Sequence, residues 1–400
     1  LILAAALFTH IMDFMIMMPL GSQLMRLFDI TPQQFSFLVS SYTFSAGIAG
    51  FGVALFIDRF DRKSGLLFVY IGFTAGTLAC AFAPTYEVLL FTRSLTGMFG
   101  GIIGALVLSI VSDAIPLGRR AAGIGFVMAA FSVASVFGVP FGLYLASIFS
   151  WHAPFLFLGG LGIIITIMIV AFIPSMKAHL NKGEAPKNPV QIVKTLFGNR
   201  NVLIGLLFTS VLMFGHFSII PFIAPYMVGN VGFTEQDLTY IYLIGGGLTI
   251  FTSPRVGRLA DKHGRLTIFT IFGILVMIPI FTITHLPPIP LWQALIVSGV
   301  FFVFANGRIV PSTTMVTSVV SAENRASFMS VRASIQQISS GLATMLAGFI
   351  ITGEPSVFEA NGEGKEIRAL VNYEYVGYIS LLFSVIALFV ARYVKVAKGS

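Results

Sequence analysis

Residues 257–265 read GRLADKHGR, and residues 54–63 read ALFIDRFDRK. Each stretch follows a long apolar run and places an aspartate beside cationic residues. These aspartates, Asp58 and Asp261, lie 203 positions apart (261 − 58 = 203), close to half of the 400 residues. We therefore predict an internal duplication, with two similar halves joined by the longest polar stretch of the sequence, residues 175–199.

The composition places these halves in a membrane. Hydrophobic residues make up 56% of the chain and charged residues only 10%, whereas soluble domains carry about 25% charged residues. Apolar runs of about 20 residues, long enough to cross a bilayer core of about 30 Å, recur along the chain. The net charge of +8 gathers in short loops on one side, which argues against nucleic acid as a partner. The chain starts at Leu1 rather than at a methionine, so we expect trimmed termini.

We predict an all-α integral membrane protein with twelve transmembrane helices in two six-helix pseudo-symmetric bundles. The bundles comprise residues 1–174 and 200–400. The linker between them, residues 175–199, is expected to be cytosolic and to contain a short interfacial helix, because its apolar residues share one helical face. The spans are expected at residues 1–21, 33–57, 64–84, 86–112, 121–147, 152–174, 200–228, 235–257, 265–285, 290–317, 325–352 and 371–394.

Lysine and arginine predict the orientation. One set of loops and ends holds Arg59, Arg62, Lys63, Arg119, Arg120, Lys177, Lys182, Lys187, Lys194, Arg200, Arg255, Arg258, Lys262, Arg265, Arg325, Arg392, Lys395 and Lys398. The opposite set holds only Arg26, Lys365 and Arg368. Cytosolic loops carry the excess of these residues, so the rich set and both termini are expected in the cytosol.

Asp13 is the one acid that the sequence places deep in the membrane. It lies in residues 7–20, which read LFTHIMDFMIMMPL. A buried ionisable group is costly and by default marks a proton relay, an ion site or a substrate site. Counting 1.5 Å per residue, Asp13 and Arg93 lie about 12 and 10 Å below the outer ends of their spans, so they can pair directly or through water. The alternative is a static ion pair that pins two helices.

Two histidines have open interpretations. His10 lies one turn before Asp13 on the same helical face. It either relays protons, since histidine titrates in the physiological range, or is only hydrogen-bonded to its surroundings. For His216 we favour packing or cavity lining.

Several motifs together resemble the major facilitator superfamily. The loop motif of that family reads Gly-x-Leu-Ala-Asp-Arg-x-Gly-Arg-Lys/Arg, which Gly257–Arg265 matches closely. The first copy departs from it, with Ala54 and Asp61 where glycines are usual. Residues 93–97 (RSLTG) resemble the buried-arginine motif of the family. Residues 138–142 (GVPFG) resemble the Gly-Pro motif of its antiporter branches, although Val139 separates the glycine from the proline.

The first span narrows the resemblance. Asp13 followed by Met18, Pro19, Leu20 and Gly21 is similar to the bacterial efflux permeases of the twelve-helix drug/proton antiporter branch. The resemblance implies the major facilitator fold, a bacterial inner membrane and a cytosolic gate. The implied gating residues are Asp58, Arg59, Arg62, Lys63, Asp113, Gly257, Asp261, Gly264 and Arg265. It also implies that Gly138, Pro140 and Gly142 bend span five, which either shapes the cavity or serves packing alone.

A central substrate cavity is expected between the halves, near mid-membrane. The residues expected to line it are Phe14, Met17, Tyr42, His216, Asn306 and Arg308. A soft wall of phenylalanine and methionine suits varied lipophilic ligands. Arg308 and Arg332 either bind an organic anion or lipid head group, or snorkel to the cytosolic interface or pair within the cytosolic gate, which we favour.

The sequence thus predicts a secondary transporter, not an enzyme. No phosphate-binding GxxxxGK[ST] motif is present, and we expect no cofactor and no metal. The leading hypothesis is proton-coupled efflux of small lipophilic or amphipathic compounds by alternating access, by a monomer whose partners are substrate, protons and membrane lipid. Its coupling residues are Asp13, Arg93 and His10. The alternatives are an organic-anion or lipid-head-group transporter or uncoupled facilitator using Arg308 and Arg332, and a non-transporting receptor or sensor.

Overall fold

The computed structural model describes residues 1–54, 60–176, 197–320, 325–356 and 367–395. The first half consists of α1 (Ile2–Ile16), α2 (Gly21–Phe28), α3 (Pro32–Ala54), α4 (Arg62–Ala81), α5 (Tyr86–Ala114), α6 (Leu117–Val133), the π-helix η2 (Ala134–Gly138), α7 (Val139–Ile148) and α8 (His152–Phe172). The second half consists of α10 (Arg200–Phe217), α11 (Ile220–Gly229), α12 (Glu235–His263), α13 (Arg265–Leu275), α14 (Met277–Thr284), α15 (Leu291–Thr317), α16 (Arg325–Ile350), β1 (Thr352–Pro355), β2 (Arg368–Val371) and α17 (Tyr373–Ala391). The predicted linker helix lies outside the described residues.

The described helices confirm an all-α membrane fold. By length and composition, eight helical segments can cross a membrane, and nine if the bent pair α1 and α2 forms one span. Three further helices, α3, α12 and α16, are also long enough, with 23, 29 and 26 residues, but they are less apolar. Small residues of these helices face the other half in part, as Gly341 of α16 faces Thr43 of α3. The count of twelve spans stays a prediction.

Prolines account for the breaks in the long helices. The axes of α1 and α2 differ by 58°, and Pro19 lies in the break between them. In the fifth predicted span, η2 interrupts the α-helix just before Pro140. Pro221 follows the break between α10 and α11, and Pro279 follows that between α13 and α14. Proline has no N–H for the helical hydrogen bond, and its ring clashes with the preceding turn.

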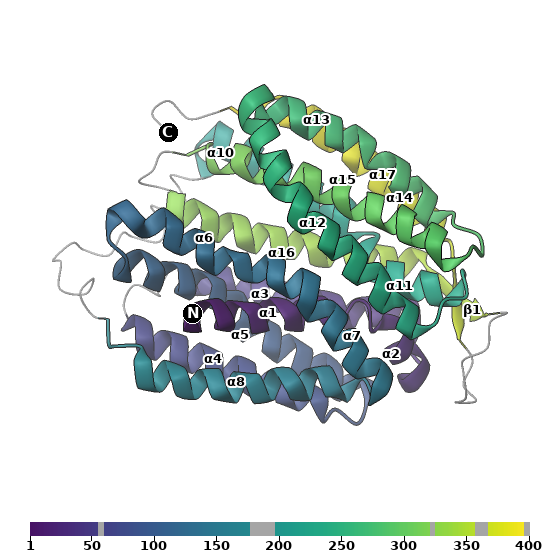
Figure 1. The fold of residues 1–400 in the computed structure, drawn as a ribbon, viewed down its shortest axis with the longest axis horizontal. Coiled ribbons are helices and arrows are strands. Elements are labelled where there is room, and N and C mark those ends of the chain that lie inside the picture. The colour runs from purple at the N-terminus through teal and green to yellow at the C-terminus, as the bar shows by residue number, and fades with distance from the viewer. Residues whose placement is uncertain (55–59, 177–196, 321–324, 357–366, 396–400) are drawn as a thin grey trace.

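The most extensive contacts between the two halves are those of α3 with α16 and of α7 with α12. Small residues permit the close approach. A Cβ on Gly348 of α16 would lie 2.2 Å from Ser36 Oγ of α3, and one on Gly246 of α12 would lie 3.0 Å from Val136 Cα of η2. Figure 1 shows α7 and α12 meeting near β1, while α6 and α12 diverge toward the chain termini. We call these two ends of the bundle the hairpin end and the terminal end.

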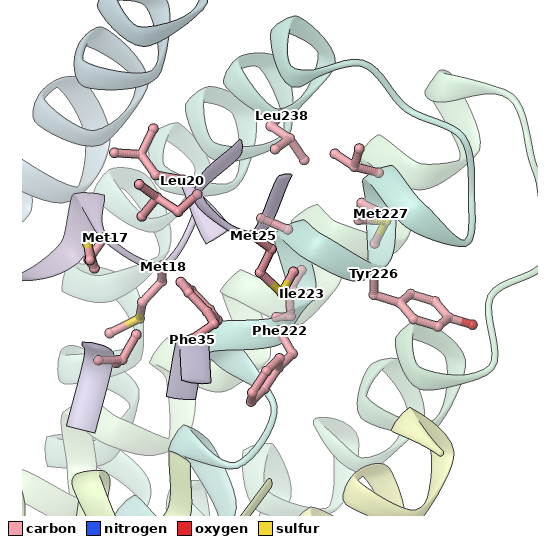
Figure 2. Packing of buried hydrophobic residues seen from close by; sticks show 14 of the residues in the cluster. Met17, Met18, Leu20, Met25, Phe35, Phe222, Ile223, Tyr226, Met227 and Leu238 are labelled. Atoms are coloured by element: carbon pink, nitrogen blue, oxygen red, sulfur yellow. The ribbon is translucent and has the colours of Figure 1, made fainter. Parts of the chain in front are cut away.

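Apolar residues of both halves form one core cluster at the hairpin end. Met17, Met18 and Phe35 of the first half and Phe222 and Ile223 of the second half lie together in Figure 2. All five are at most 5% exposed. This packing closes the hairpin end between the halves.

Two short strands between α16 and α17 form a β-hairpin at this end. Strands β1 and β2 pair antiparallel, with Thr352 opposite Val371. The side chain of Asn230 at the end of α11 accepts a hydrogen bond from Leu370 N–H (2.8 Å) and donates one to Leu370 O (3.0 Å). The hairpin is therefore anchored to the second half.

Candidate functional site

Asp13 and Arg93 form a buried ion pair. Arg93 Nη1 of α5 lies 2.8 Å from Asp13 Oδ2 of α1, and neither side chain is exposed to solvent. Thr77 Oγ1 of α4 donates a hydrogen bond to the other carboxylate oxygen at 3.3 Å. The pair therefore ties three helices together within the first half. Removal of one partner of such a pair leaves an uncompensated buried charge.

The guanidinium of Arg93 also lies on an aromatic ring. Its Cζ is 4.4 Å from the centroid of the Tyr42 ring on α3, a geometry in which the ring face attracts the cation. Gly97 makes this possible, because a Cβ there would lie 2.3 Å from the carbonyl oxygen of Tyr42. Among the described residues, Nε and Nη2 of Arg93 have no hydrogen-bond partner. The site therefore holds unused donors beside the paired carboxylate.

His10 contacts Tyr42 rather than Asp13. Its Nδ1 lies 2.9 Å from the Tyr42 hydroxyl, and its ring meets the edge of Phe73 at 5.9 Å between centroids. Tyr42 thus stands between the imidazole and Arg93. The predicted proton-relay role of His10 stays a prediction.

A second buried polar cluster lies in the other half. Arg308 of α15 is 1% exposed and donates from Nη1 to Ser384 Oγ of α17 at 2.9 Å. Its Nη2 lies 3.4 Å from His216 Nδ1 of α10. The snorkelling expected for Arg308 as an alternative is thus not observed, since the side chain is held inside the bundle.

A row of aromatic contacts links the two clusters. Phe14 stacks on Tyr42 with 5.4 Å between centroids and contacts Phe217 of the other half at 6.1 Å. Phe217 in turn meets the ring of its neighbour His216 at 5.6 Å. The row crosses from one half of the molecule to the other. Neither Phe217 nor Ser384 was predicted from the sequence. Phe217 nevertheless follows Phe14 by 203 positions, the offset that separates Asp58 from Asp261, which we call the repeat distance.

Met17 and Asn306, the other predicted cavity residues, and Arg332, predicted as a deep cation, have the following neighbours. Met17 is buried in the core cluster of the hairpin end. Asn306 donates to Ser253 Oγ of α12 at 2.8 Å. Arg332, 8% exposed, has Nη1 4.0 Å from Met329 Sδ. Two pockets of about 530 and 350 Å³ are lined by other residues, the larger one beside β1 and β2 and the smaller one between α12 and α15.

The first copy of the loop motif is only partly described. Asp58 and Arg59 lie outside the described residues. Arg62 Nε pairs with Asp113 Oδ2 at 3.2 Å, linking the start of α4 to the end of α5, and Lys63 Nζ donates to Val170 O at the end of α8 (2.9 Å). These bonds brace the terminal end within the first half.

Asp61 stands where the loop motif of the family usually has a glycine, and it is the N-cap of α4. Its carboxylate accepts hydrogen bonds from Met176 N–H (2.7 Å), the Ser175 hydroxyl (3.0 Å), Lys63 N–H (3.3 Å) and the Ser64 hydroxyl (3.2 Å). Partial burial raises the pKa of this carboxyl, but the four hydrogen bonds together outweigh it and lower the pKa below its ordinary value. Asp61 therefore joins the end of α8 to the start of α4.

The second motif copy forms the last two turns of α12, and only its Gly264 lies in the turn between α12 and α13. Gly264 has a φ of 92°, a conformation that favours glycine, and Arg265 begins α13. Asp261 is exposed, and a Cβ on Gly257 would meet nothing within 4 Å. The gating role of all these residues stays a prediction.

Two ion pairs missed by the sequence reasoning join the halves at the hairpin end. Arg26 of α2 lies 3.1 Å from Glu235 of α12, and Arg368 of β2 lies 2.6 Å from Asp29. Each partner lies far from the other in sequence, so spacing gave no signal for the pairing. We call Arg26–Glu235 and Arg368–Asp29 the hairpin-end ion pairs.

Two glycines of the fifth predicted span allow α1 to pack closely against it. A Cβ on Gly138 would lie 3.1 Å from Met12 Sδ, and one on Gly142 would lie 2.7 Å from Ile16 Cδ1. Together with η2 and Pro140, these glycines place the fifth span directly against the helix that carries Asp13. The role that the resemblance implies for this bend, shaping the cavity, stays a prediction.

The fold and the buried polar sites define a polytopic membrane protein of two helical halves. A model of the Major Facilitator Superfamily matches residues 3–344. The chain belongs to the Major Facilitator Superfamily. Within the described residues, no group of three His, Cys, Asp or Glu side chains could hold a metal ion.

The relatives and structural neighbours are transporters. The "Probable sugar efflux transporter" of Helicobacter acinonychis (strain Sheeba) is 23% identical over 309 residues, covering 75% of this chain and 77% of that protein. The "Uncharacterized MFS-type transporter YceJ" of Bacillus subtilis (strain 168) is 23% identical, covering 84% and 85%. A crystal structure of a D-xylose-proton symporter has a TM-score of 0.76 at 15% identity, covering 100% and 98%. The protein is thus a multi-pass membrane transporter of a small-molecule substrate and not an enzyme.

Proposed function

We propose that the protein exports its substrate by proton antiport, with Asp13 as the group that binds and releases the proton. The observation that carries this proposal is the fully buried Asp13–Arg93 ion pair at 2.8 Å. It is a carboxylate inside the membrane whose partner has two further unused donors. Membrane-buried acids of this kind are characteristic of proton relays in transporters.

The terminal end faces the cytosol in this proposal. It carries the loops rich in lysine and arginine, which remain on the cytosolic side during membrane insertion. The hairpin end then faces outward and is closed in the present structure by the core cluster and the hairpin-end ion pairs. We assign the protein to a bacterial inner membrane.

Transport follows from a competition between proton and substrate. In the inward-open state, binding of substrate is accompanied by loss of the proton from Asp13, and the carboxylate pairs with Arg93. In the outward-open state, Asp13 takes up a proton and substrate leaves. The bound substrate drives the exchange only because it has different affinities for the two states. The motif residues at the terminal end serve as the gate on the cytosolic side.

The substrate class that we favour is small lipophilic or amphipathic compounds. Phe14, Phe217 and Tyr42 supply aromatic surface where the two halves meet, and such surfaces accept varied apolar ligands. A sugar is the second candidate, because relatives of Helicobacter carry that name.

The test is proton movement in proteoliposomes that contain a pH-sensitive dye. A panel of lipophilic cations, neutral amphiphiles, sugars and organic anions is applied to the wild type, to Asp13→Asn, and to the matched control Glu87→Gln at the exposed start of α5. We expect at least one compound to evoke proton flux in the wild type and the control, and the flux to fall to background in Asp13→Asn. Substrate flux that is equal in all three proteins without proton movement would identify a facilitator. Absence of any flux would favour a receptor.

A further inference from the structure

Among the described residues, no acidic side chain pairs with the positive charge in the polar cluster of the second half. Arg308 is bonded to the Ser384 hydroxyl and to His216 Nδ1, and the imidazole nitrogen can accept this bond only when the ring is neutral. Arg308 Nε has no hydrogen-bond partner among the described residues. Both partners of this buried guanidinium are therefore neutral, and one of its donors is unused.

Acidic residues of the described second half lie at the ends of the bundle. They are Glu235 and Asp237 at the start of α12, Asp261 at its end, Glu354 in β1 and Glu374 at the start of α17. Ser384, in contrast, lies about 16 Å along α17 from its first residue, near the middle of a membrane about 30 Å thick. The buried acid of the first half, Asp13, is already paired with Arg93. The charge of Arg308 thus has no acid at its own depth in this part of the chain.

The two halves differ in charge at one equivalent position. His216 stands at the repeat distance from Asp13 (216 − 13 = 203), the same offset that separates Asp58 from Asp261. In the first half this position supplies a carboxylate to a buried arginine, whereas in the second half it supplies a neutral ring. A buried cation is stable only when it is paired. The described part of the second half therefore lacks a buried anion equivalent to Asp13.

We propose that His216, Arg308 and Ser384 form a binding site for the anionic group of the transported compound. Ligand carboxylate oxygens take the donors of the guanidinium, a pairing that Arg makes in two parallel bonds. The apolar part of the ligand lies on Phe217, which neighbours His216, and on Phe14 across the interface. The substrate class is thus an amphipathic organic anion. This inference rests on the proposed function and names its substrate.

The experiment measures binding to the purified protein in detergent by equilibrium dialysis. The probes are matched pairs of aromatic carboxylates and their neutral amides, beginning with 2-naphthoate and 2-naphthamide. The variants are Arg308→Gln and Arg308→Met, with Arg255→Gln as the control, since Arg255 is exposed in the same half and bonds only its own helix at Phe251 O (2.8 Å) among the contacts described. Arg308→Met removes the charge without adding a polar group, so a folded protein is expected even if Arg308→Gln is unstable.

We expect the wild type and Arg255→Gln to bind at least one acid about tenfold or more tightly than its amide, a ratio that corresponds to about 1.4 kcal/mol. In both Arg308 variants the ratio should fall close to one. A wild type that binds no acid in preference to its amide, or an Arg308→Met variant that keeps the preference, overturns the proposal. Asp13→Asn separates this outcome from the proton proposal, because it should keep the acid preference while it loses proton flux.

Discussion

Phe14 and Phe217 occupy equivalent positions in the two halves, and their ring centroids lie 6.1 Å apart. The offset between them is the repeat distance (217 − 14 = 203). Two equivalent residues can contact each other only near the axis that relates the halves, so this pair marks the centre of the transporter. The residues that precede them, Asp13 and His216, have diverged in chemistry. The centre is thus symmetric in its aromatic surface and asymmetric in charge.

The first prediction concerns this aromatic pair. Phe14→Ala and Phe217→Ala should each destabilise the protein, and the double variant should lose less than the sum, with a coupling of about 0.5–1.5 kcal/mol. The measurement is a double-mutant cycle of unfolding free energies in denaturing detergent. Strictly additive losses would show that the two rings do not interact in the membrane.

The second prediction concerns Gly97, which allows α5 and Arg93 to approach Tyr42 of α3. Gly97→Ala should destabilise the protein by about 1–3 kcal/mol, because the new methyl group would overlap the backbone of α3 and displace Tyr42 from the guanidinium. Gly104→Ala on the same helix is the matched control, since its Cβ would meet nothing within 4 Å. It should be neutral or stabilising by about 0.5–1 kcal/mol. Thermal unfolding of both variants in detergent checks this, and equal midpoints would contradict it.

The third prediction concerns the hairpin-end ion pairs. Asp29→Asn removes the charge that faces Arg368 and keeps a side chain that tolerates the φ of 51° at this position. An exposed ion pair contributes about 0.2–1 kcal/mol, so the outward-open population should rise by up to about fivefold. The readout is the labelling rate of Ser22→Cys by an impermeant maleimide in a Cys80→Ala background, because Ser22 is 8% exposed at this end.

Glu374→Gln at the start of α17 is the control for that experiment, as it removes an acid from the same end without touching either pair. Its labelling rate should equal that of the parent. High salt should shrink the effect of Asp29→Asn, since screening weakens exposed pairs. A labelling rate unchanged by Asp29→Asn at low salt would show that the pair does not hold the outer side closed.

The fourth prediction concerns the pH dependence of the terminal end. The pKa of Asp61 is lower in the folded protein than its value of about 3.9 in an unfolded chain. The carboxylate therefore stabilises the joint between α4 and α8 above about pH 4, and this contribution is lost as the pH falls through the folded pKa. Hydrogen exchange at the Met176 amide, corrected for its intrinsic pH dependence, should accelerate below that range. Asp61→Ala should show fast exchange already at neutral pH, and equal protection in both proteins would contradict the assignment.

The sequence predicted those features that depend on local pattern. Apolar runs of the right length located the helices, and the motif copies at Asp58 and Asp261 led us to predict the duplication. The depth count placed Asp13 and Arg93 at one level, and the structure brings them into direct contact. The fold class was accessible because hydrophobic length is set by membrane thickness alone.

The rest depends on which face of each helix points inward. In an apolar helix periodicity says little about this, so Thr77 and Ser384 were not found, and Met17 was assigned to a cavity although it packs in the core at the hairpin end. The hairpin-end ion pairs join residues hundreds of positions apart, and only the fold brings them together. Phe217 could have been predicted by applying the repeat offset to Phe14.

The central claim is that Asp13 exchanges a proton, and its protonation can be observed without knowing the substrate. Infrared difference spectra of wild type minus Asp13→Asn, recorded in lipid over about pH 9 to 5, isolate the C=O stretch of this one carboxylic acid. We predict a band that appears on acidification in the wild type and is missing in the variant. Spectra that show no titrating band from Asp13 over the whole range would mean that its protonation does not change there, which would contradict the proposed proton coupling.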